Sequence, residues 1–499
     1  MSFSNSGASQ FPSSAAPRPF ADRQAEVAAL DRFWEEPSAQ CIPVVGRRRV
    51  GKTYLLEHFA AGKRHVYHRC NLQGTEHQLA RLGAAIAEAT GDPVLRAQPP
   101  STWEAVFAAI ERLAVAGRLL LIVDEVPYWV AKDDSVPSVL QNWWDARGRY
   151  LDLMLVLCGS AVQMMEKLLT GPAPLAGCVT GRLRVHPFDF RAAAEMTRFT
   201  DPVDALTAYG ILGGVPLYLS YLRPDRSLSE NVLHAIASPT ARLYVEPMAV
   251  FAAHHESYNR EQALAVLRAI ANRQHHWSAI EEATKLRGAS LSNVMDRLVD
   301  DLGLVERLLP VTEVHQTRAY RTQYRLVDNF FRFWFRFIEP NQDHIEFGHA
   351  RRVVDAIFAE MSEFMGSAFE DICRDWVRLA SAAGALPVRV WRVGTWWDPS
   401  HDVDVVGLDA ARRVALTGEC TWTTGPFGGR ELETYLGHVR ALGDRVRPEA
   451  AHALFCKTGF TEPVRAWAAQ RGAVLCTPAD LLAAFGSVET SSVSDSGRP

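Results

Sequence analysis

Short apolar runs alternate with longer amphipathic stretches over the first part of the chain. The runs are CIPVV (41–45), LLLIVD (119–124) and LMLVLCG (153–159). Apolar runs without polar interruption are typical of parallel strands that are buried on both faces. Apolar residues at helical spacing predict helices between these strands, at 75–90, 103–117 and 136–148. Strands that alternate with helices predict an α/β domain with a doubly wound parallel sheet.

The pattern becomes helical after about residue 200. Residues 202–256 are mostly helical in spacing and predict a helical lid behind the sheet. Three shorter helices are predicted next, at 259–274, 276–286 and 288–303. The stretch RAYRTQYRLVD (318–328) then predicts one strand of a β-hairpin. Three short helices followed by a hairpin predict a winged helix-turn-helix.

The last part of the chain returns to a mixed pattern, in the order helix, strand, strand, strand, helix, strand. The first four segments are FEDICRDWVRLA (369–380), VRVWRVGTWWD (388–398), DVDVVGLD (402–409) and VALTGECTW (414–422). The first two strands are expected to form a hairpin and the third to lie beside them. A second α/β domain is therefore predicted at the end of the chain.

Composition narrows the class of protein only slightly. The 499 residues contain 48% hydrophobic and 22% charged residues, which is ordinary for a globular protein, and the length suggests about three domains. A net charge of −4 means that any contact with nucleic acid needs a local basic patch. The eight cysteines include no CxxC pair, which argues against a zinc site or a disulfide framework and favours a cytoplasmic protein. No apolar stretch approaches the roughly 18 residues of a membrane span, so no membrane association is expected.

The loop after the first predicted strand is suited to binding nucleotide phosphates. Gly46 and Gly51 stand five residues apart and are followed by Lys52 and Thr53. Glycines let backbone N–H groups approach phosphate oxygens, the lysine reaches the β- and γ-phosphates, and the threonine hydroxyl binds Mg²⁺. The whole predicted ATP-binding loop comprises Gly46, Arg47, Arg48, Arg49, Val50, Gly51, Lys52, Thr53 and Tyr54.

Polar residues at the ends of the next two strands supply candidate catalytic groups. Asp124 is placed to contact Mg²⁺, and Glu125 to orient an attacking water. Ser160 could sense the γ-phosphate or simply cap a helix. The ends of parallel strands are where such sheets bind ligands.

Arginines near this site have more than one interpretation. Arg182 could neutralise transition-state charge, in cis or from a neighbouring subunit in a homo-oligomer, or could be a surface residue. The three consecutive arginines of the loop, Arg47 to Arg49, either hold the loop against acidic neighbours or contact a polyanion.

The chain resembles the archaeal-type ATPase family, a P-loop branch close to the AAA+ and STAND proteins. The matching stretches are FADRQAEVAAL (20–30), GRRRVGKTYLL (46–56), IVDEVPYW (122–129), LCGSAV (157–162), GRLRVHPFDF (181–190) and LGGVPLYL (212–219). The resemblance implies ATP binding and slow hydrolysis, with Lys52, Thr53, Asp124 and Glu125 in the matching positions. The aromatic-rich stretch YRLVDNFFRFWFRFIEPNQ (324–342) resembles the linker of family members that carry a further C-terminal domain, and its density predicts core packing.

The predicted winged helix has an unfavourable charge for DNA. Its third helix presents Asp296, Asp300 and Asp301 against Arg297, which suits a phosphate-lined groove poorly. The predicted wing suits contact with DNA better than this helix does, because it carries Arg307, Arg318, Arg321 and Arg325. Packing or protein contact is an equal alternative to DNA binding.

The C-terminal order of elements resembles the PD-(D/E)XK, restriction-endonuclease-like fold. Asp404 and Glu419 are expected on adjacent strands, with Glu370 reaching over from the helix, as a possible metal site. The resembled family has a lysine two residues after the glutamate, where this chain has Thr421. Threonine supplies no positive charge, so the domain is predicted to be a weak or inactive nuclease unless another cation such as Lys457 substitutes.

The sequence therefore predicts an ATPase whose nucleotide state, with Mg²⁺, controls a winged-helix module and a nuclease-like domain, with DNA as the favoured partner. The alternatives are an ATP-dependent signalling switch that binds protein, and an ATP-gated, Mg²⁺-dependent DNA nuclease. The predicted boundaries are a disordered tail at 1–18, an ATPase core at 19–200, a helical lid at 201–258, a winged helix and aromatic linker at 259–340, a restriction-endonuclease-like domain at 341–486 and a disordered tail at 487–499.

Overall fold

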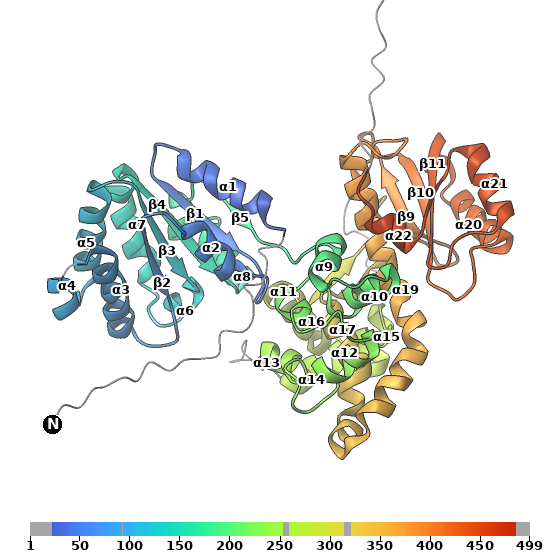
Figure 1. Cartoon of the computed structure of the whole chain (residues 1–499), viewed down its shortest axis with the longest axis horizontal. Coiled ribbons are helices and arrows are strands. Elements are labelled where there is room, and N and C mark those ends of the chain that lie inside the picture. Colours follow the sequence, from blue (N-terminus) through green and yellow to red (C-terminus); the bar gives the residue numbers. More distant parts are fainter. Residues whose placement is uncertain (1–21, 92, 253–258, 314–320, 486–499) are drawn as a thin grey trace, which may run out of the picture.

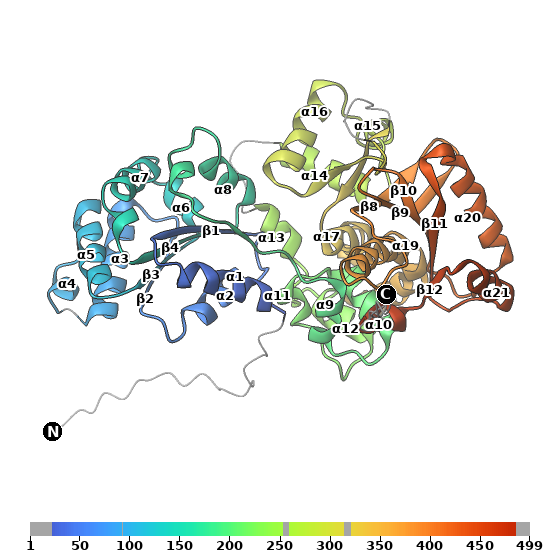
Figure 2. The ribbon, with the colours of Figure 1, turned by 90° about the horizontal axis from the view of Figure 1, so that it is seen from above.

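The computed structural model describes residues 22–91, 93–252, 259–313 and 321–485, so both predicted tails lie outside the described residues. Figure 1 shows the N-terminal α/β body in blue and teal, a helical middle in green and yellow, and a C-terminal α/β body in orange and red. In both views the helical middle lies between the two sheet-containing bodies (Figures 1 and 2). None of the described helices is both long and apolar enough to cross a membrane.

The N-terminal body contains a parallel sheet with the strand order β2-β3-β4-β1-β5. Its strands are β1 (Gln40–Val45), β2 (His65–Arg69), β3 (Leu119–Asp124), β4 (Leu153–Gly159) and β5 (Leu183–Arg184). Every residue of β1, β3 and β4 is buried, as their uninterrupted apolar runs predict. The predicted doubly wound parallel sheet is thus present.

Helices cover both faces of this sheet. One face packs against α1 (Gln24–Glu35) and α2 (Lys52–Ala60). The other packs against α3 (Thr75–Thr90), α5 (Trp103–Val115), α7 (Val136–Ala146) and α8 (Val162–Leu169), and α4 (Pro93–Ala97) and α6 (Val126–Val130) complete this body. The alternation of strand and helix along the chain produces these two layers.

The middle of the chain is helical, as predicted. It begins with α9 (Phe190–Thr197), α10 (Pro202–Leu212), α11 (Pro216–Leu219), α12 (Leu228–Ala235) and α13 (Glu246–Ala252). Next come α14 (Arg260–Ala271), α15 (Trp277–Thr284) and α16 (Ala289–Asp296), followed by the antiparallel pair β6 (Val305–Leu308) and β7 (Gln323–Leu326). Three helices and a hairpin therefore follow one another in the predicted order.

The aromatic-rich segment lies in the core of the middle body. It forms α17 (Asn329–Phe333) and the helical turn that follows, and Phe330, Phe333, Trp334 and Phe335 are fully buried. These rings pack with α19 (Ala350–Ala382), a 33-residue helix that also contacts the C-terminal sheet. The segment therefore packs the core, as its density predicts.

The C-terminal body contains a sheet with the order β12-β11-β10-β9-β8. The strands are β8 (Arg392–Trp397), β9 (Asp402–Leu408), β10 (Val414–Thr421), β11 (Val446–Cys456) and β12 (Val474–Cys476). Helices α20 (Gly429–Ala441), α21 (Glu462–Arg471) and α22 (Pro478–Leu482) complete it. β8 and β9 form the predicted hairpin, and β10 runs antiparallel to β9 and parallel to β11.

Candidate nucleotide-binding site

The phosphate-binding loop joins β1 to α2 at the carboxyl edge of the N-terminal sheet. Gly51 caps α2 with a φ of 91°, a left-handed conformation that glycine adopts without strain. Gly46 lies so close to β5 that an added Cβ would stand 2.3 Å from the carbonyl oxygen of Val185. Both glycines are therefore required by the path of the loop.

The ammonium group of Lys52 lies inside this loop. Its Nζ atom donates to the carbonyl oxygens of Gly46 (2.7 Å) and Arg47 (3.0 Å), and the residue is 5% exposed. Burial lowers the pKa of this lysine. A phosphate group that entered the loop would relieve the cost of burying this charge.

Asp124 meets the loop from the end of β3. Its Oδ2 atom accepts hydrogen bonds from the hydroxyl groups of Thr53 (2.9 Å) and Tyr67 (2.8 Å). The residue is 1% exposed, and no hydrogen-bond partner of its Oδ1 atom is found in the part of the chain that the structure describes. A buried carboxylate oxygen without a partner, beside a threonine hydroxyl, suits the oxygen ligands that Mg²⁺ prefers. These residues therefore fit the predicted Mg²⁺ site.

Glu125 and Ser160, which the sequence predicts separately, are hydrogen-bonded to each other. The Oγ atom of Ser160 donates to Oε2 of Glu125 at 2.7 Å, and the backbone N–H of Ser160 donates to the same oxygen at 3.2 Å. Ser160 does not cap α8, whose N-cap is Ala161. Its place in the structure is to hold the Glu125 carboxylate at the pocket.

A pocket of about 540 Å³ opens beside the loop. Its polar wall contains Lys52, Thr53 and Glu125. Its less polar wall comes from Phe188 and from the first helices of the middle body, with Met196 of α9, Pro216 and Leu217 of α11, and Ser220. A polar wall and an apolar wall fit the phosphates and the base of a nucleotide.

Two arginines that line this pocket, Arg23 and Arg69, were not predicted as site residues from the sequence. Arg23 is 6% exposed, lies 4.6 Å from the ring centre of Phe188 and donates to the carbonyl oxygens of Val50 (2.9 Å) and His186 (2.8 Å). Its signal in the sequence was the matching segment at 20–30. Arg69, at the end of β2, carries no such signal, because the strand HVYHR has no apolar run that would place it beside Asp124.

The arginines of the loop reach the helical middle. Arg47 forms an ion pair with Asp328, just before α17, and Arg49 forms one with Glu246, at the start of α13. The two carboxylate side chains are only 3% and 4% exposed. Arg48 instead approaches the Tyr128 hydroxyl at 3.4 Å, and Tyr54 lines the pocket. Arg47 and Arg49 therefore hold the loop against acidic neighbours, the first of the two interpretations.

Arg182 is not at the pocket. Its guanidinium donates to the carbonyl oxygen of Leu169 at the end of α8 and lies 3.5 Å from the carboxylate of Glu166. It is absent from the pocket lining in the described part of the chain. A role in cis has no support in this geometry, and a role in trans stays a prediction.

The three C-terminal carboxylates come from the predicted elements. Asp404 and Glu419 lie on the neighbouring strands β9 and β10, and Asp404 accepts a hydrogen bond from the N–H of Cys420 at 2.9 Å. Burial raises the pKa of Glu419 to about 8, with Asp402 and Glu370 adding to the shift. Burial, Glu370 and Glu419 also hold the pKa of Asp404 well above its usual range. These buried carboxylates therefore keep a proton at higher pH than exposed acidic side chains do.

The predicted metal site of Glu370, Asp404 and Glu419 stays a prediction. Among the residues with described positions, no three acidic, histidine or cysteine side chains are arranged to hold a metal ion. Arg374 explains part of this, because its guanidinium lies 3.4 Å from Glu370 and donates to the backbone oxygen of Asp404 at 2.7 Å. Lys457, the candidate replacement for the missing lysine, lies beside Thr421, because its backbone N–H donates to the carbonyl oxygen of Thr421 at 3.0 Å and its ammonium lies 5.4 Å from the ring centre of Trp422. Its catalytic role stays a prediction.

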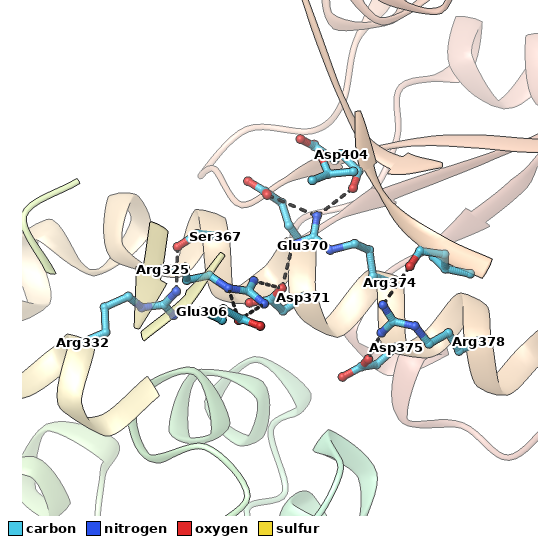
Figure 3. A network of polar contacts seen from close by, with 12 residues as sticks. Glu306, Arg325, Arg332, Ser367, Glu370, Asp371, Arg374, Asp375, Arg378 and Asp404 are labelled. Atoms are coloured by element: carbon cyan, nitrogen blue, oxygen red, sulfur yellow. Dashed lines mark hydrogen bonds and ion pairs between the residues drawn. The ribbon is translucent and has the colours of Figure 1, made fainter. Parts of the chain in front are cut away.

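Arg374 belongs to a chain of ion pairs that links the hairpin to the C-terminal sheet (Figure 3). Arg325 of β7 pairs with Glu306 of β6 and with Asp371 of α19. Asp371 also accepts from Arg374 at 2.7 Å. The predicted sequence motifs gave no indication of this network, because its members lie on separate elements.

The described arginines of the hairpin are not free for phosphate contacts. Arg307 pairs with Asp296 (2.9 Å) and Asp300 (3.4 Å), Arg321 with Glu313 (2.6 Å), and Arg325 with Glu306 and Asp371. Arg318 lies outside the described residues. Contact between the predicted wing and DNA therefore stays a prediction, in which the three described arginines would have to leave their carboxylate partners.

Comparisons with known proteins agree with the N-terminal site. Residues 20–222 match a family described as an ATPase domain predominantly from Archaea, and residues 334–433 match a family described as archaeal and bacterial proteins of unknown function. An uncharacterized protein of Methanocaldococcus jannaschii is 25% identical over 409 residues, which cover 81% of this chain and 87% of that protein. An uncharacterized ATP-binding protein of the same archaeon is 44% identical over 45 residues, 9% of this chain and 76% of that protein.

A solved structure supports the fold. A Walker-type ATPase of Pyrococcus abyssi aligns with a TM-score of 0.50 at 19% identity, covering 63% of this chain and 96% of that one. The chain is thus similar to the predominantly archaeal ATPase domain family over residues 20–222, and to the second family, that of archaeal and bacterial proteins of unknown function, over residues 334–433.

Proposed function

We propose that the chain is an ATP-hydrolysing switch, in which the nucleotide state of the N-terminal pocket is transmitted to the helical middle and the C-terminal sheet. The observation that carries the proposal is that Lys52, Thr53 and Glu125 line one pocket together with a less polar wall, while buried Asp124 is hydrogen-bonded to Thr53. Nucleotide triphosphate is the ligand that this combination suits best.

The residues of the pocket divide the work of hydrolysis. Lys52 would leave the carbonyl oxygens of Gly46 and Arg47 to bind the β- and γ-phosphates, for which it is the buried cation of the loop. Thr53 and Asp124 would hold Mg²⁺, which when bound neutralises phosphate charge. Glu125, fixed by Ser160, would orient the attacking water and accept its proton.

The contacts of Arg47 support the transmission step. Its backbone oxygen accepts from Lys52, while its side chain pairs with the buried carboxylate of Asp328. Movement of Lys52 would therefore act on the backbone of Arg47, whose side chain is paired with Asp328 at the start of α17. Arg49 and its pair with Glu246 supply a second contact of the same kind.

The transmission continues toward the C-terminal sheet. Asp328 is the N-cap residue of α17 and lies three residues after Arg325 of β7. Arg325 pairs with Asp371 of α19, and Asp371 pairs with Arg374, which reaches the backbone of Asp404 on β9 (Figure 3). Ion pairs at the two ends of residues 325–328 thus connect the loop with the carboxylates Glu370, Asp404 and Glu419 by way of the backbone between Arg325 and Asp328, which supplies a contiguous route for coupling.

The experiment is ATP turnover measured with and without double-stranded DNA at low and moderate salt. Because the described hairpin arginines are paired with carboxylates, we expect slow turnover that DNA does not change. A DNA-stimulated rate that falls steeply with salt would instead support the DNA-controlling alternative. That alternative keeps one favourable observation, the succession of three helices and a hairpin at residues 260–326.

The C-terminal domain is proposed to act as a binding module without nuclease activity. Thr421 supplies no charge, and Arg374 is engaged with Glu370, Asp371 and the backbone of Asp404. Plasmid DNA should stay uncut in Mg²⁺, with or without ATP. Cleavage that Asp404→Ala abolishes would show that the nuclease alternative is right.

A further inference from the structure

The pocket contains an arginine that no motif assigns. We propose that Arg69 contacts the γ-phosphate of ATP from within the same chain during hydrolysis, a proposal that rests on the ATPase activity proposed above. Arg69 is the last residue of β2 and pairs in register with Asp124 of β3. It lines the pocket together with Lys52, Thr53 and Glu125.

The guanidinium of Arg69 can turn toward a ligand. Its side chain is 52% exposed, and its ion pair with Asp124 is long, at 3.4 Å from Nε to Oδ2. The same Oδ2 atom already accepts from Thr53 and Tyr67. Asp124 therefore does not depend on Arg69 for its partners, and a phosphate group offers the guanidinium two oxygens in place of one shared oxygen.

The other two arginines that line the pocket in the described chain are engaged elsewhere. Arg23 is buried and holds two backbone carbonyl groups, and Arg49 is paired with the buried carboxylate of Glu246. Arg182 lies against α8. Of the arginines that line the pocket in the described chain, Arg69 is thus the one with a half-exposed guanidinium beside Asp124.

The chemistry of phosphoryl transfer gives this residue its role. Water attacks the γ-phosphorus, the bond to the β–γ bridging oxygen breaks with its electron pair passing to ADP, and a proton of the water passes to Glu125. Negative charge is spread over the oxygens of the γ-phosphoryl group during this step, and an arginine there stabilises it. Arg69 neither gains nor loses a proton.

The test compares Arg69→Ala and Arg69→Lys with Arg96→Ala, a matched change of an exposed arginine on α4. Three quantities are measured in Mg²⁺ for each protein: kcat for ATP, the Kd values of ATP and ADP, and trapping of ADP with aluminium fluoride, which imitates the transferred group. We expect Arg69→Ala to lower kcat about 10²–10³-fold, to abolish trapping and to change both Kd values only a few-fold. Arg69→Lys should recover part of kcat, and Arg96→Ala should match the unmodified protein.

Two results would overturn the assignment of Arg69. One is ADP–aluminium fluoride trapping by Arg69→Ala that equals trapping by the unmodified protein. The other is a loss of ATP and ADP affinity as large as the loss of kcat, which would mean that Arg69 only supports the pocket. An unmodified protein that binds ATP without turnover would also overturn it and leave nucleotide binding standing, whereas a protein that binds no ATP would contradict the proposed function itself.

Discussion

Glu125 has an unusual backbone conformation at the junction of β3 and α6, with a φ of 60°. The left-handed region costs a non-glycine residue roughly 1–2 kcal/mol, and such residues are common at functional sites. In this conformation the Glu125 carboxylate accepts two hydrogen bonds from Ser160 and faces the pocket. We therefore infer that this backbone conformation directs the Glu125 carboxylate toward the pocket for catalysis.

The variant Glu125→Gln tests whether the Glu125 carboxylate accepts a proton from the attacking water. The amide keeps the size of the side chain, and its oxygen can still accept from Ser160, so folding and ATP binding should be retained. ATP turnover should fall about 100-fold, because an amide does not accept a proton from water as a carboxylate does. The measurements are the Kd of ATP and kcat. Loss of folding together with binding would show that Glu125 is structural.

The sequence could predict those site residues that belong to one local motif. Gly46, Lys52 and Thr53 act within a single strand–loop–helix unit, so their order in the chain determines their placement. Arg69 and Arg374 act through partners on other elements, and no local pattern indicates which elements become neighbours. Long-range charge pairs are therefore the part of the site that required the structure.

Among the elements, the central strands of the N-terminal sheet could be predicted from the sequence, whereas its edge strands could not. β1, β3 and β4 are central and fully buried, so their apolar runs predicted them nearly to the residue. β2 and β5 lie at the two edges of the sheet. An edge strand needs no continuous apolar run, and β2 alternates between buried and exposed residues while β5 has only two residues, so both escaped prediction.

The acidic cluster on β9, β10 and α19 predicts how stability depends on pH. Burial and neighbouring carboxylates raise the pKa of Glu419 from 4.5 to about 8 in the folded chain. The folded state therefore binds this proton more tightly than the unfolded state. The stability that comes from the protonated form is complete below about pH 4.5 and is lost as pH rises toward 8.

The variant Glu419→Gln should remove this dependence. In the presence of a chelator, its Tm should exceed that of the unmodified protein by a margin that grows from pH 5 to pH 8, because glutamine has no charge to bury. Glu433→Gln, which changes an exposed carboxylate on α20, is the matched control and should show no such trend. A constant Tm difference between pH 5 and pH 8 would mean that the Glu419 carboxylate is not protonated in the cluster.

At the scale of the whole molecule, two ion pairs connect the phosphate-binding loop to the helical middle, Arg47–Asp328 and Arg49–Glu246. Asp328 binds Arg47 with one oxygen and caps α17 with the other, accepting from the N–H of Phe330 at 2.7 Å. A change at the loop should therefore reach the backbone of residues 323–333. Mg²⁺ and ATP are expected to change hydrogen exchange of this segment in the unmodified protein.

The variant Arg47→Ala should cancel the response of residues 323–333 and leave the response of the loop itself. Arg48→Ala is the matched control from the same loop, because Arg48 makes no ion pair with the helical middle among the described residues. It should respond as the unmodified protein does. An unchanged response of residues 323–333 in Arg47→Ala would show that coupling follows another route.

ATP turnover by the full chain, measured for the unmodified protein and for Lys52→Ala, decides whether the N-terminal pocket binds and hydrolyses ATP. Lys52 is 5% exposed and is the loop's buried cation for the β- and γ-phosphates. We expect Mg²⁺-dependent turnover by the unmodified protein and a fall to background in the variant. Undiminished turnover in Lys52→Ala would contradict the assignment of the site.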